Sequence, residues 1–518
     1  MFIAADQEGG NVSRVTFGTT GVSNMALAAA GNAEYAETMG RIFGEELGLL
    51  GINVDFAPVM DINNNPVIGI RSFSDSVSIV SEFGLAFQKG LHDTGTLTSL
   101  KHFPGHGNTD TDSHSGFPKI DSTLEELKAF ELIPFQAAID DGADMIMTAH
   151  IQYPEIEKET YVSISTGEEV YLPATMSDDI LTGLLRNDMK FEGVVVSDAL
   201  DMEAISKNFE YKDVLRYTIN AGADMVIIPP VKDPDSYMLV YQTPDLIEEL
   251  IKNGEISTER LDEAVRRILT LKEKYGLLKQ NDFAASEEKI RKAEEGIGSQ
   301  EHRKTVWNIA EQALTVLKND DAFPLSVREG EKTLIVLADT CASRAAIGEA
   351  AKQILEKNSL LPEGAEVTSI LHTVKDQENG EEVIKAAQEA DHVILLYRSW
   401  DSICLDPESG NGLSVPVFTQ IIKNRHEAGK KTIFLSGLLP YDAARFPDAD
   451  AIVLTYCSSS MKELPPETGK GSSYCPNLVA GICSCFGMGT PAGRLPVNIN
   501  APDETGHISD TVLWPRAE

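Results

Sequence analysis

Fourteen consecutive residues, from Lys101 to His114, concentrate side chains that can carry out proton chemistry. They include one lysine, three histidines and two aspartates. One residue separates Asp112 from His114, so in an irregular loop the carboxylate can reach the imidazole and fix its tautomer. A histidine near its reference pKa of ~6.5 can give up a proton at neutral pH and take it back. The spacing therefore predicts an acid/base pair on a loop, and Pro104, Gly105 and Gly107 give that loop unusual backbone angles.

A second candidate is the carboxylate of Asp198, which follows the apolar run 194–196. A strand of this kind places Asp198 rigidly at its carboxyl end, where a carboxylate can attack the anomeric carbon of a sugar. An acid/base on a loop together with a rigid carboxylate is typical of a retaining glycosidase. The unusual feature is a histidine in place of the usual carboxylic acid.

Metal binding is the alternative interpretation of the loop, because histidine and carboxylate are common metal ligands. The residues that could supply such a centre are His102, His106, Asp110, Asp112 and His114. Metal analysis and a chelator would distinguish a metal-dependent hydrolase from a glycosidase.

Short apolar strands alternate with amphipathic helices over roughly the first half of the chain. Strands are expected at 2–5, 52–56, 97–100, 145–148, 193–196 and 225–228, and helices at 33–50, 79–92, 124–139, 179–185, 213–220 and 258–269. The segments 138–147 and 218–227 resemble each other, and each reads as a helix end, a glycine cap and a buried strand. This alternation predicts an α/β fold with a parallel sheet, and the repeat favours a TIM-like (β/α)8 barrel over a doubly wound sheet.

Polar residues follow several of these strands directly. They are Asp6, Asp61, Lys101, His102, His150 and Asp198. The carboxyl ends of barrel strands meet on one face, so we expect these side chains to converge there.

The chain of 518 residues is too long for one compact core. We expect a catalytic barrel over 1–275, a charged linker over 276–305 and an α/β sandwich domain over 306–518. Strands of the second domain are expected at 334–337, 393–397, 433–435 and 452–455, with helices at 345–356 and 381–389.

The formal net charge of −36 argues against nucleic acid as a partner, because the electric field of the protein would repel phosphates.

No apolar run reaches 18 residues, so no transmembrane span is expected. The six cysteines show no paired CxxC spacing, which predicts free thiols.

With these residues in place, the chain resembles the β-N-acetylglucosaminidases of glycoside hydrolase family 3. The most specific match is the run Lys101–Gly107 followed by Asp112 and His114. Further matching segments are 6–10, 68–74, 147–150, 197–202, 313–319 and 493–496.

The resemblance implies a role for each matching residue. Asp198 matches the catalytic nucleophile, His114 the general acid/base and Asp112 its partner. The residues that match the sugar-binding set are Asp6, Arg14, Arg71, Lys101 and His102, and we add His150, which either lines the pocket or is a satisfied core histidine. The family pattern also implies that the first strand–helix unit of the barrel is missing here, either by truncation or as an unfilled gap.

The sequence thus predicts a retaining exo-β-N-acetylglucosaminidase that needs no cofactor and acts on a carbohydrate, with cell-wall fragments as the implied natural substrate. A phosphorylase of the same family is the nearest alternative, since a histidine acid/base carries no negative charge to repel phosphate. A non-catalytic sugar-binding protein is a third. Localisation is not readable, because any export signal would have come before Met1.

Overall fold

The computed structural model describes most of the chain and divides it into two compact units. The described residues are 1–63, 68–107, 116–231, 235–279, 286–338, 346–372, 379–398, 414–457, 476–503 and 508–517. The first unit contains Met1–Asp6, Phe43–Ile68 and Ser76–Arg291, and the second contains Gln7–Ile42, Gly69–Asp75 and Lys292–Glu518. The domain boundaries proposed from the sequence remain a prediction.

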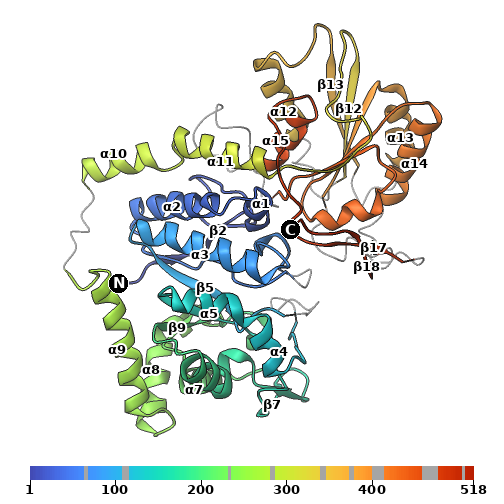
Figure 1. The fold of residues 1–518 in the computed structure, drawn as a ribbon. Coiled ribbons are helices and arrows are strands. Elements are labelled where there is room, and N and C mark those ends of the chain that lie inside the picture. The colour runs from blue at the N-terminus through green and yellow to red at the C-terminus, as the bar shows by residue number, and fades with distance from the viewer. Residues whose placement is uncertain are drawn as a thin grey trace. The chain divides into compact units, whose positions relative to one another are not determined.

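The first unit is built on a six-stranded parallel sheet (Figure 1). In sheet order its strands are β1 (Ala4–Ala5), β4 (Val54–Asp55), β5 (Leu97–Phe103), β6 (Met145–Thr148), β9 (Val194–Ala199) and β10 (Met225–Ile227). All six fall on predicted strands, and the spatial order equals the order along the chain. The predicted α/β fold with a parallel sheet is confirmed. In the described part of the chain, β1 and β10 each pair with one neighbour, so the curled sheet is open there.

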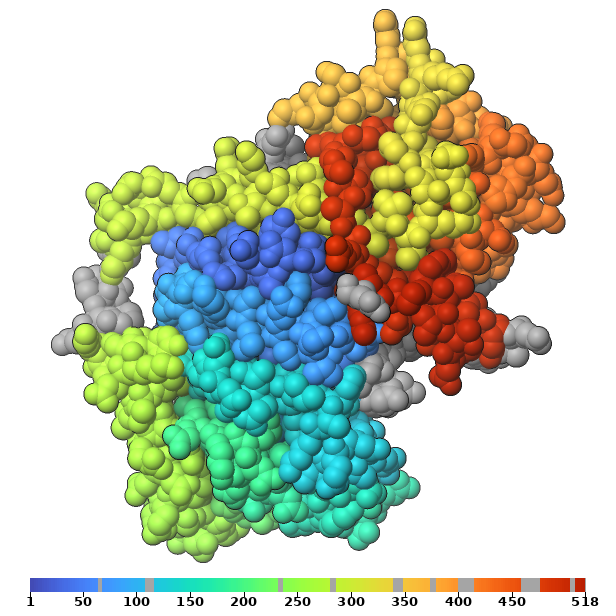
Figure 2. Space-filling model, viewed as in Figure 1, coloured from blue at the N-terminus to red at the C-terminus, as the bar shows by residue number. Residues whose placement is uncertain are grey.

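Helices connect these strands. Those of the first unit are α3 (Val77–Asp93), α4 (Leu124–Ala129), α5 (Leu132–Asp140), the π-helix η3 (Asp179–Asp188), α7 (Tyr211–Ala221), α8 (Met238–Lys252) and α9 (Thr258–Lys274). The helix α2 (Glu34–Leu49) begins in the second unit and ends in the first. The exposed faces of α8 and α9 form the yellow-green surface of this unit in Figure 2. The hairpin β7 (Thr160–Val162) and β8 (Glu169–Tyr171) lies between β6 and η3 in the chain.

One predicted helix, 124–139, is two helices in the structure. Thr123 caps α4 through a complete capping box with Glu126, and the helix ends at Phe130. Pro134 explains the break, because in a continuous helix its ring would remove a hydrogen bond and clash with the carbonyl of Phe130. In the first turn of α5 the missing N–H of Pro134 costs nothing.

The repeated segment seen in the sequence places a buried aspartate immediately before two of the strands. Asp144 precedes β6 and binds Lys274, Tyr275 and His92, with distances of 2.8, 2.6 and 2.9 Å. Asp224 precedes β10 and binds guanidinium groups of Arg186, Arg260 and Arg267 at 2.7, 2.7 and 3.0 Å. Both carboxylates thereby attach α9 to the sheet.

The second unit contains a six-stranded mixed sheet. In sheet order its strands are β11 (Thr315–Asn319), β16 (Ala451–Leu454), β15 (Ile433–Ser436), β14 (His392–Tyr397), β12 (Lys332–Ala338) and β13 (Glu366–His372). β11 runs antiparallel to β16, and the other pairs are parallel. Neither β11 nor β13 was predicted, because these two edge strands are partly exposed and lack a continuous apolar run.

Helices and a hairpin complete this unit. The helices are α1 (Asn24–Ala29), α11 (Gln300–Ala313), α12 (Ala346–Lys357), α13 (Gly380–Glu389), α14 (Ser414–Glu427) and α15 (Pro476–Ser484), and the hairpin is β17 (Ile499–Pro502) with β18 (Ile508–Trp514). Every residue of α1 is buried, and α1 contacts α11. The predicted linker contains α10 (Glu287–Gly296), which buries no residue, and the start of α11.

Two smaller expectations concern cysteines and membranes. Cys483 and Cys485 are free thiols, as predicted, and both are buried, as is Cys457. Cys341, Cys404 and Cys475 lie outside the described residues. None of the described helices has both the length and the apolar character of a membrane span.

Candidate active site

The carboxyl edge of the parallel sheet carries most of the predicted site residues. Asp6 follows β1, Lys101 and His102 end β5, His150 follows β6, and Asp198 lies near the end of β9. The strands that supply them are close neighbours in one sheet, so their ends meet along one edge. Interactions between these side chains and their surroundings show which residues the fold brings together.

Lys101 and Asp6 form a direct ion pair across the sheet. The distance between Lys101 Nζ and Asp6 Oδ1 is 2.6 Å. Lys101 is 1% exposed, whereas Asp6 is half-buried. A partly buried, charge-assisted hydrogen bond of this kind holds both side chains in fixed positions.

Asp61 orients His102 and the start of the loop that follows. Its Oδ2 lies 2.7 Å from His102 Nδ1, and its Oδ1 accepts the backbone N–H of His106 at 2.9 Å. Burial alone would raise the pKa of Asp61, but the charge and hydrogen bond of His102 and the charge of His106 hold it below its usual value. A charged carboxylate accepts hydrogen bonds only, so His102 carries a proton on Nδ1. The sequence had singled out Asp61 as a strand-end residue but gave it no role.

Asp198 is half-buried, and its carboxylate is influenced by Lys101 and His102. Its Oδ1 accepts the backbone N–H of Ala199 at 2.7 Å. Burial raises the pKa of Asp198, yet the charge of His102, the Ala199 hydrogen bond and the Lys101 charge contribute to lowering it below the ordinary value. Asp198 is therefore an ionised carboxylate at neutral pH, which is the form that a nucleophile requires.

His150 is buried, and the protein binds both of its ring nitrogens. Nδ1 lies 2.7 Å from Thr175 Oγ1, and Nε2 lies 3.0 Å from the carbonyl oxygen of Ala199. The ring is therefore anchored to the residue that follows Asp198. Nothing in the sequence pattern around Thr175 had indicated this contact.

Two predicted sugar-binding arginines belong to the second unit. Arg71 makes a bidentate pair with the buried carboxylate of Glu8, at 2.9 and 2.8 Å. Arg14 is exposed, and its backbone N–H donates to Gln7 Oε1 at 2.9 Å. Their role in sugar binding remains a prediction.

The predicted acid/base pair, His114 and Asp112, lies outside the described residues, as does Asp110. Among the residues that are described, no group of three or more His, Cys, Asp or Glu side chains could hold a metal ion.

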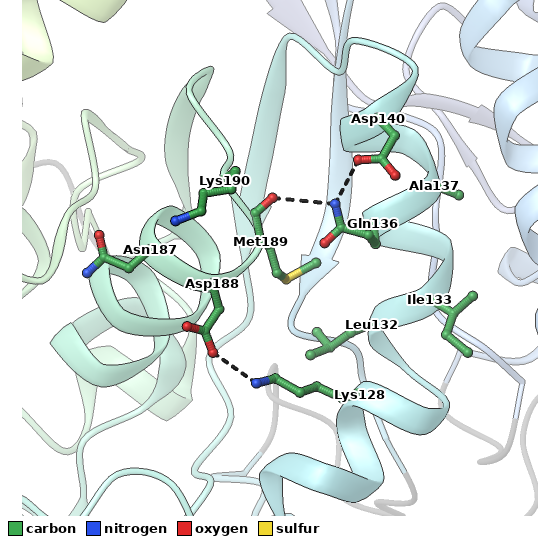
Figure 3. Close-up of a pocket in the computed structure, with 10 residues that line it drawn as sticks. All are labelled: Lys128, Leu132, Ile133, Gln136, Ala137, Asp140, Asn187, Asp188, Met189 and Lys190. Atoms are coloured by element: carbon green, nitrogen blue, oxygen red, sulfur yellow. Dashed lines mark hydrogen bonds and ion pairs between the residues drawn. The ribbon is translucent and has the colours of Figure 1, made fainter.

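A hollow of about 770 Å³ lies elsewhere on the first unit, between α5 and the end of η3 (Figure 3). Lys128 and Asp188 pair across it at 2.9 Å, and Gln136 donates to Asp140 at 2.8 Å. Its floor includes Leu132 and Met189. None of the predicted site residues lines this hollow.

Comparisons with known proteins agree on one family. The glycosyl hydrolase family 3 N terminal domain matches residues 1–271. β-Hexosaminidase A of Pseudoalteromonas piscicida is 32% identical, over 96% of this chain and 83% of that protein. β-Hexosaminidase LpqI of Mycobacterium tuberculosis is 33% identical, over 52% of this chain and 68% of that protein.

Solved structures give the same result. The structure of a glycoside hydrolase family 3 β-N-acetylglucosaminidase from Paenibacillus sp. str. FPU-7 superposes with a TM-score of 0.76 at 27% identity. The superposition covers 97% of this chain and 87% of that one.

Proposed function

The chain belongs to glycosyl hydrolase family 3, and we propose that within this family it is a retaining exo-β-N-acetylglucosaminidase. It is a glycoside hydrolase, and the relatives named β-hexosaminidase support an N-acetylated amino sugar as the substrate. The observation that carries the proposal is the ionised carboxylate of Asp198 at the end of β9, beside Lys101, His102 and His150.

In the proposed reaction, a carboxylate oxygen of Asp198 attacks the anomeric carbon of the terminal sugar. The bond to the leaving oxygen breaks while His114, steadied by Asp112, donates a proton to that oxygen. The resulting glycosyl ester is then attacked by water, from which His114 removes a proton, and the sugar leaves with its configuration retained.

The sugar-binding part of the proposal uses charged groups that are fixed in advance. Lys101 and Asp6 can exchange charge-assisted hydrogen bonds with sugar hydroxyls, and their 2.6 Å ion pair already fixes their positions. His102 is oriented by Asp61. We propose Arg14, Arg71 and His150 as further members of this set, as the sequence predicts.

Hydrolysis of a chromogenic β-N-acetylglucosaminide tests the assignment. Asp198→Asn should lower kcat by about 10⁴-fold, since the nucleophile is lost. Asp179→Asn is the matched control, because Asp179 is an exposed carboxylate of the same unit. An Asp198→Asn variant as active as wild type would end the assignment.

A fluorinated N-acetylglucosaminide that forms a long-lived ester tests the covalent step. The intact mass of the wild-type protein should rise by one glycosyl group, and that of Asp198→Asn should not.

Turnover in phosphate buffer distinguishes the phosphorylase alternative, because hydrolysis gives the free sugar and phosphorolysis gives the sugar 1-phosphate.

The proposed natural substrates are fragments of bacterial cell wall that end in β-linked N-acetylglucosamine. Purified fragments should release the free amino sugar, measured by chromatography. Release from chitobiose, but not from these fragments, would replace the cell wall with chitin-type oligosaccharides as the substrate class.

A further inference from the structure

We infer that Thr175 is a positioning residue for the reaction, which acts through His150 on the nucleophile Asp198. The inference rests on the proposed function in assigning that role to Asp198. It gives His150 a task different from the sugar contact predicted from the sequence.

The hydrogen bonds of His150 define the state of its ring. Nε2 faces the carbonyl oxygen of Ala199 at 3.0 Å, and a carbonyl only accepts, so Nε2 carries a proton. In the neutral ring Nδ1 must then accept, and the group that faces it is Thr175 Oγ1 at 2.7 Å. The hydroxyl of Thr175 therefore selects the tautomer that can bind Ala199.

The single hydroxyl proton of Thr175 has two acceptors within reach. The contact to His150 Nδ1, at 2.7 Å, is shorter than the contact to the carbonyl oxygen of Ala149, at 3.0 Å. Thr148 Oγ1 lies 2.8 Å from Thr175 Oγ1 and can donate to it. The result is one directed chain of donors that runs from Thr148 through Thr175 and His150 to the Ala199 carbonyl.

This series of hydrogen bonds ends at Ala199, whose N–H binds the nucleophile Asp198. The N–H of Ala199 donates to Asp198 Oδ1 at 2.7 Å, while its carbonyl accepts from His150 and from the N–H of Met202 at 3.2 Å. Ala199 is thus fixed on both sides. The carbonyl and the N–H of Ala199 belong to two successive peptide planes that meet at its Cα. A shift of Ala199 as a whole after loss of the His150 bond would move the N–H that faces Asp198, and a displacement of about 1 Å at a nucleophile can cost 10²-fold in rate.

The Thr175 hydroxyl is buried, so its hydrogen bond cannot be replaced by water. Thr175 and Thr148 are 0% exposed, and His150 is 1% exposed. Water does not replace a lost bond at such a site, so removal of the hydroxyl leaves Nδ1 without its donor. The effect passes through the ring to Ala199 and Asp198.

Valine and serine at position 175 test the inference kinetically. Thr175→Val keeps the shape and removes the hydroxyl, and we expect kcat to fall by about 10- to 100-fold with KM changed by less than about threefold. Thr175→Ser restores the hydroxyl and should recover kcat to within about threefold of wild type. Thr218→Val is the control, because Thr218 is equally buried in the same unit and its hydroxyl has no hydrogen-bond partner among the described residues.

Nitrogen NMR of histidine-labelled protein provides a readout that does not depend on turnover. The His150 signals, assigned by comparison with His150→Gln, should show the Nε2–H tautomer in wild type, and the Nδ1 signal should shift in Thr175→Val, which has lost the hydroxyl that donates to Nδ1. A wild-type ring protonated on Nδ1 alone, or a Thr175→Val variant with unchanged kcat, would overturn the inference. If wild type does not cleave the sugar, the proposed function fails, and the tautomer measurement still decides the role of Thr175.

Discussion

Asp144 and Asp224 occupy equivalent positions in two repeats of the parallel sheet, and both bind the same helix. Each follows a Gly-Ala pair and immediately precedes a strand, β6 or β10. Asp224 binds Arg260 in the first turn of α9 and Arg267 near its middle, and Asp144 binds Lys274 at its end. The repeat found in the sequence therefore secures α9 at both ends.

Asp224→Ala should strongly destabilise the first unit. The side chain of Asp224 is fully buried, and its loss would leave three guanidinium groups without their shared carboxylate. Removing one partner of a buried ion pair costs about 3–5 kcal/mol. Urea unfolding measures this loss as a lower free energy of unfolding. Asp188→Ala removes an exposed partner of Lys128 and should cost at most about 1 kcal/mol. Equal losses of stability in the two variants would contradict this role of Asp224.

Asp144 should make stability depend on pH in the acid range. Burial raises the pKa of Asp144, but hydrogen bonds from His92, Lys274 and Tyr275 hold it below the ordinary value. As pH falls through about 4, the unfolded chain takes up a proton first, so the contribution of Asp144 is lost towards its folded pKa.

Urea unfolding of wild type and Asp144→Asn at pH 7, 5 and 3 tests this dependence. The difference in unfolding free energy between the two proteins should be the same at pH 7 and 5, and smaller at pH 3. A difference that stays constant down to pH 3 would show that Asp144 has no depressed pKa.

Two glycines one turn apart in α2 should respond oppositely to alanine. A Cβ on Gly44 would lie 2.0 Å from Thr94 Oγ1, whereas a Cβ on Gly48 meets nothing within 4 Å. Gly44→Ala should therefore cost about 1–3 kcal/mol through overpacking. Gly48→Ala should gain about 0.4–1 kcal/mol, because alanine restricts the unfolded chain. Thermal melting of both variants checks the opposite signs.

His102→Gln should shift the acid limb of the pH–rate profile upwards. The charge of His102 is the first of the influences that lower the pKa of Asp198 against the effect of burial. Without it, Asp198 takes up a proton at higher pH, and kcat/KM falls at higher pH than in wild type. His426→Gln, which changes a more exposed histidine paired with Asp450, should leave the profile in place. An unmoved acid limb in His102→Gln would contradict the electrostatic role.

The sequence predicted the elements whose signals are local. Apolar runs such as Met145–Thr148 marked buried parallel strands, and the same pattern marked Asp198 as a strand-end carboxylate. The edge strand β13 and the two-residue strand β3 (Val12–Ser13) were missed, because half-exposed or very short strands lack such runs.

The contacts around the site depend on residues far apart in the chain, and no local pattern encodes them. Thr175 reaches His150 across 25 residues, and Asp61 reaches His102 across 41. A single sequence shows that Asp61 ends a strand, but only the fold shows which imidazole it orients. Residue chemistry could be predicted from the sequence, whereas the pairing of those residues could not.

The second unit combines two early segments, Gln7–Ile42 and Gly69–Asp75, with the chain from Lys292 onwards. A ribosome that adds roughly 5–20 residues each second needs tens of seconds to supply the later part, and α1 lacks its partner α11 until then. Until α11 is made, α1 has only early segments such as Gly69–Arg71 to pack against, so part of this apolar helix stays uncovered. We expect chaperones that bind nascent chains to bind this apolar surface. Splitting the gene between the two halves would leave each product with apolar surface that the other half normally covers.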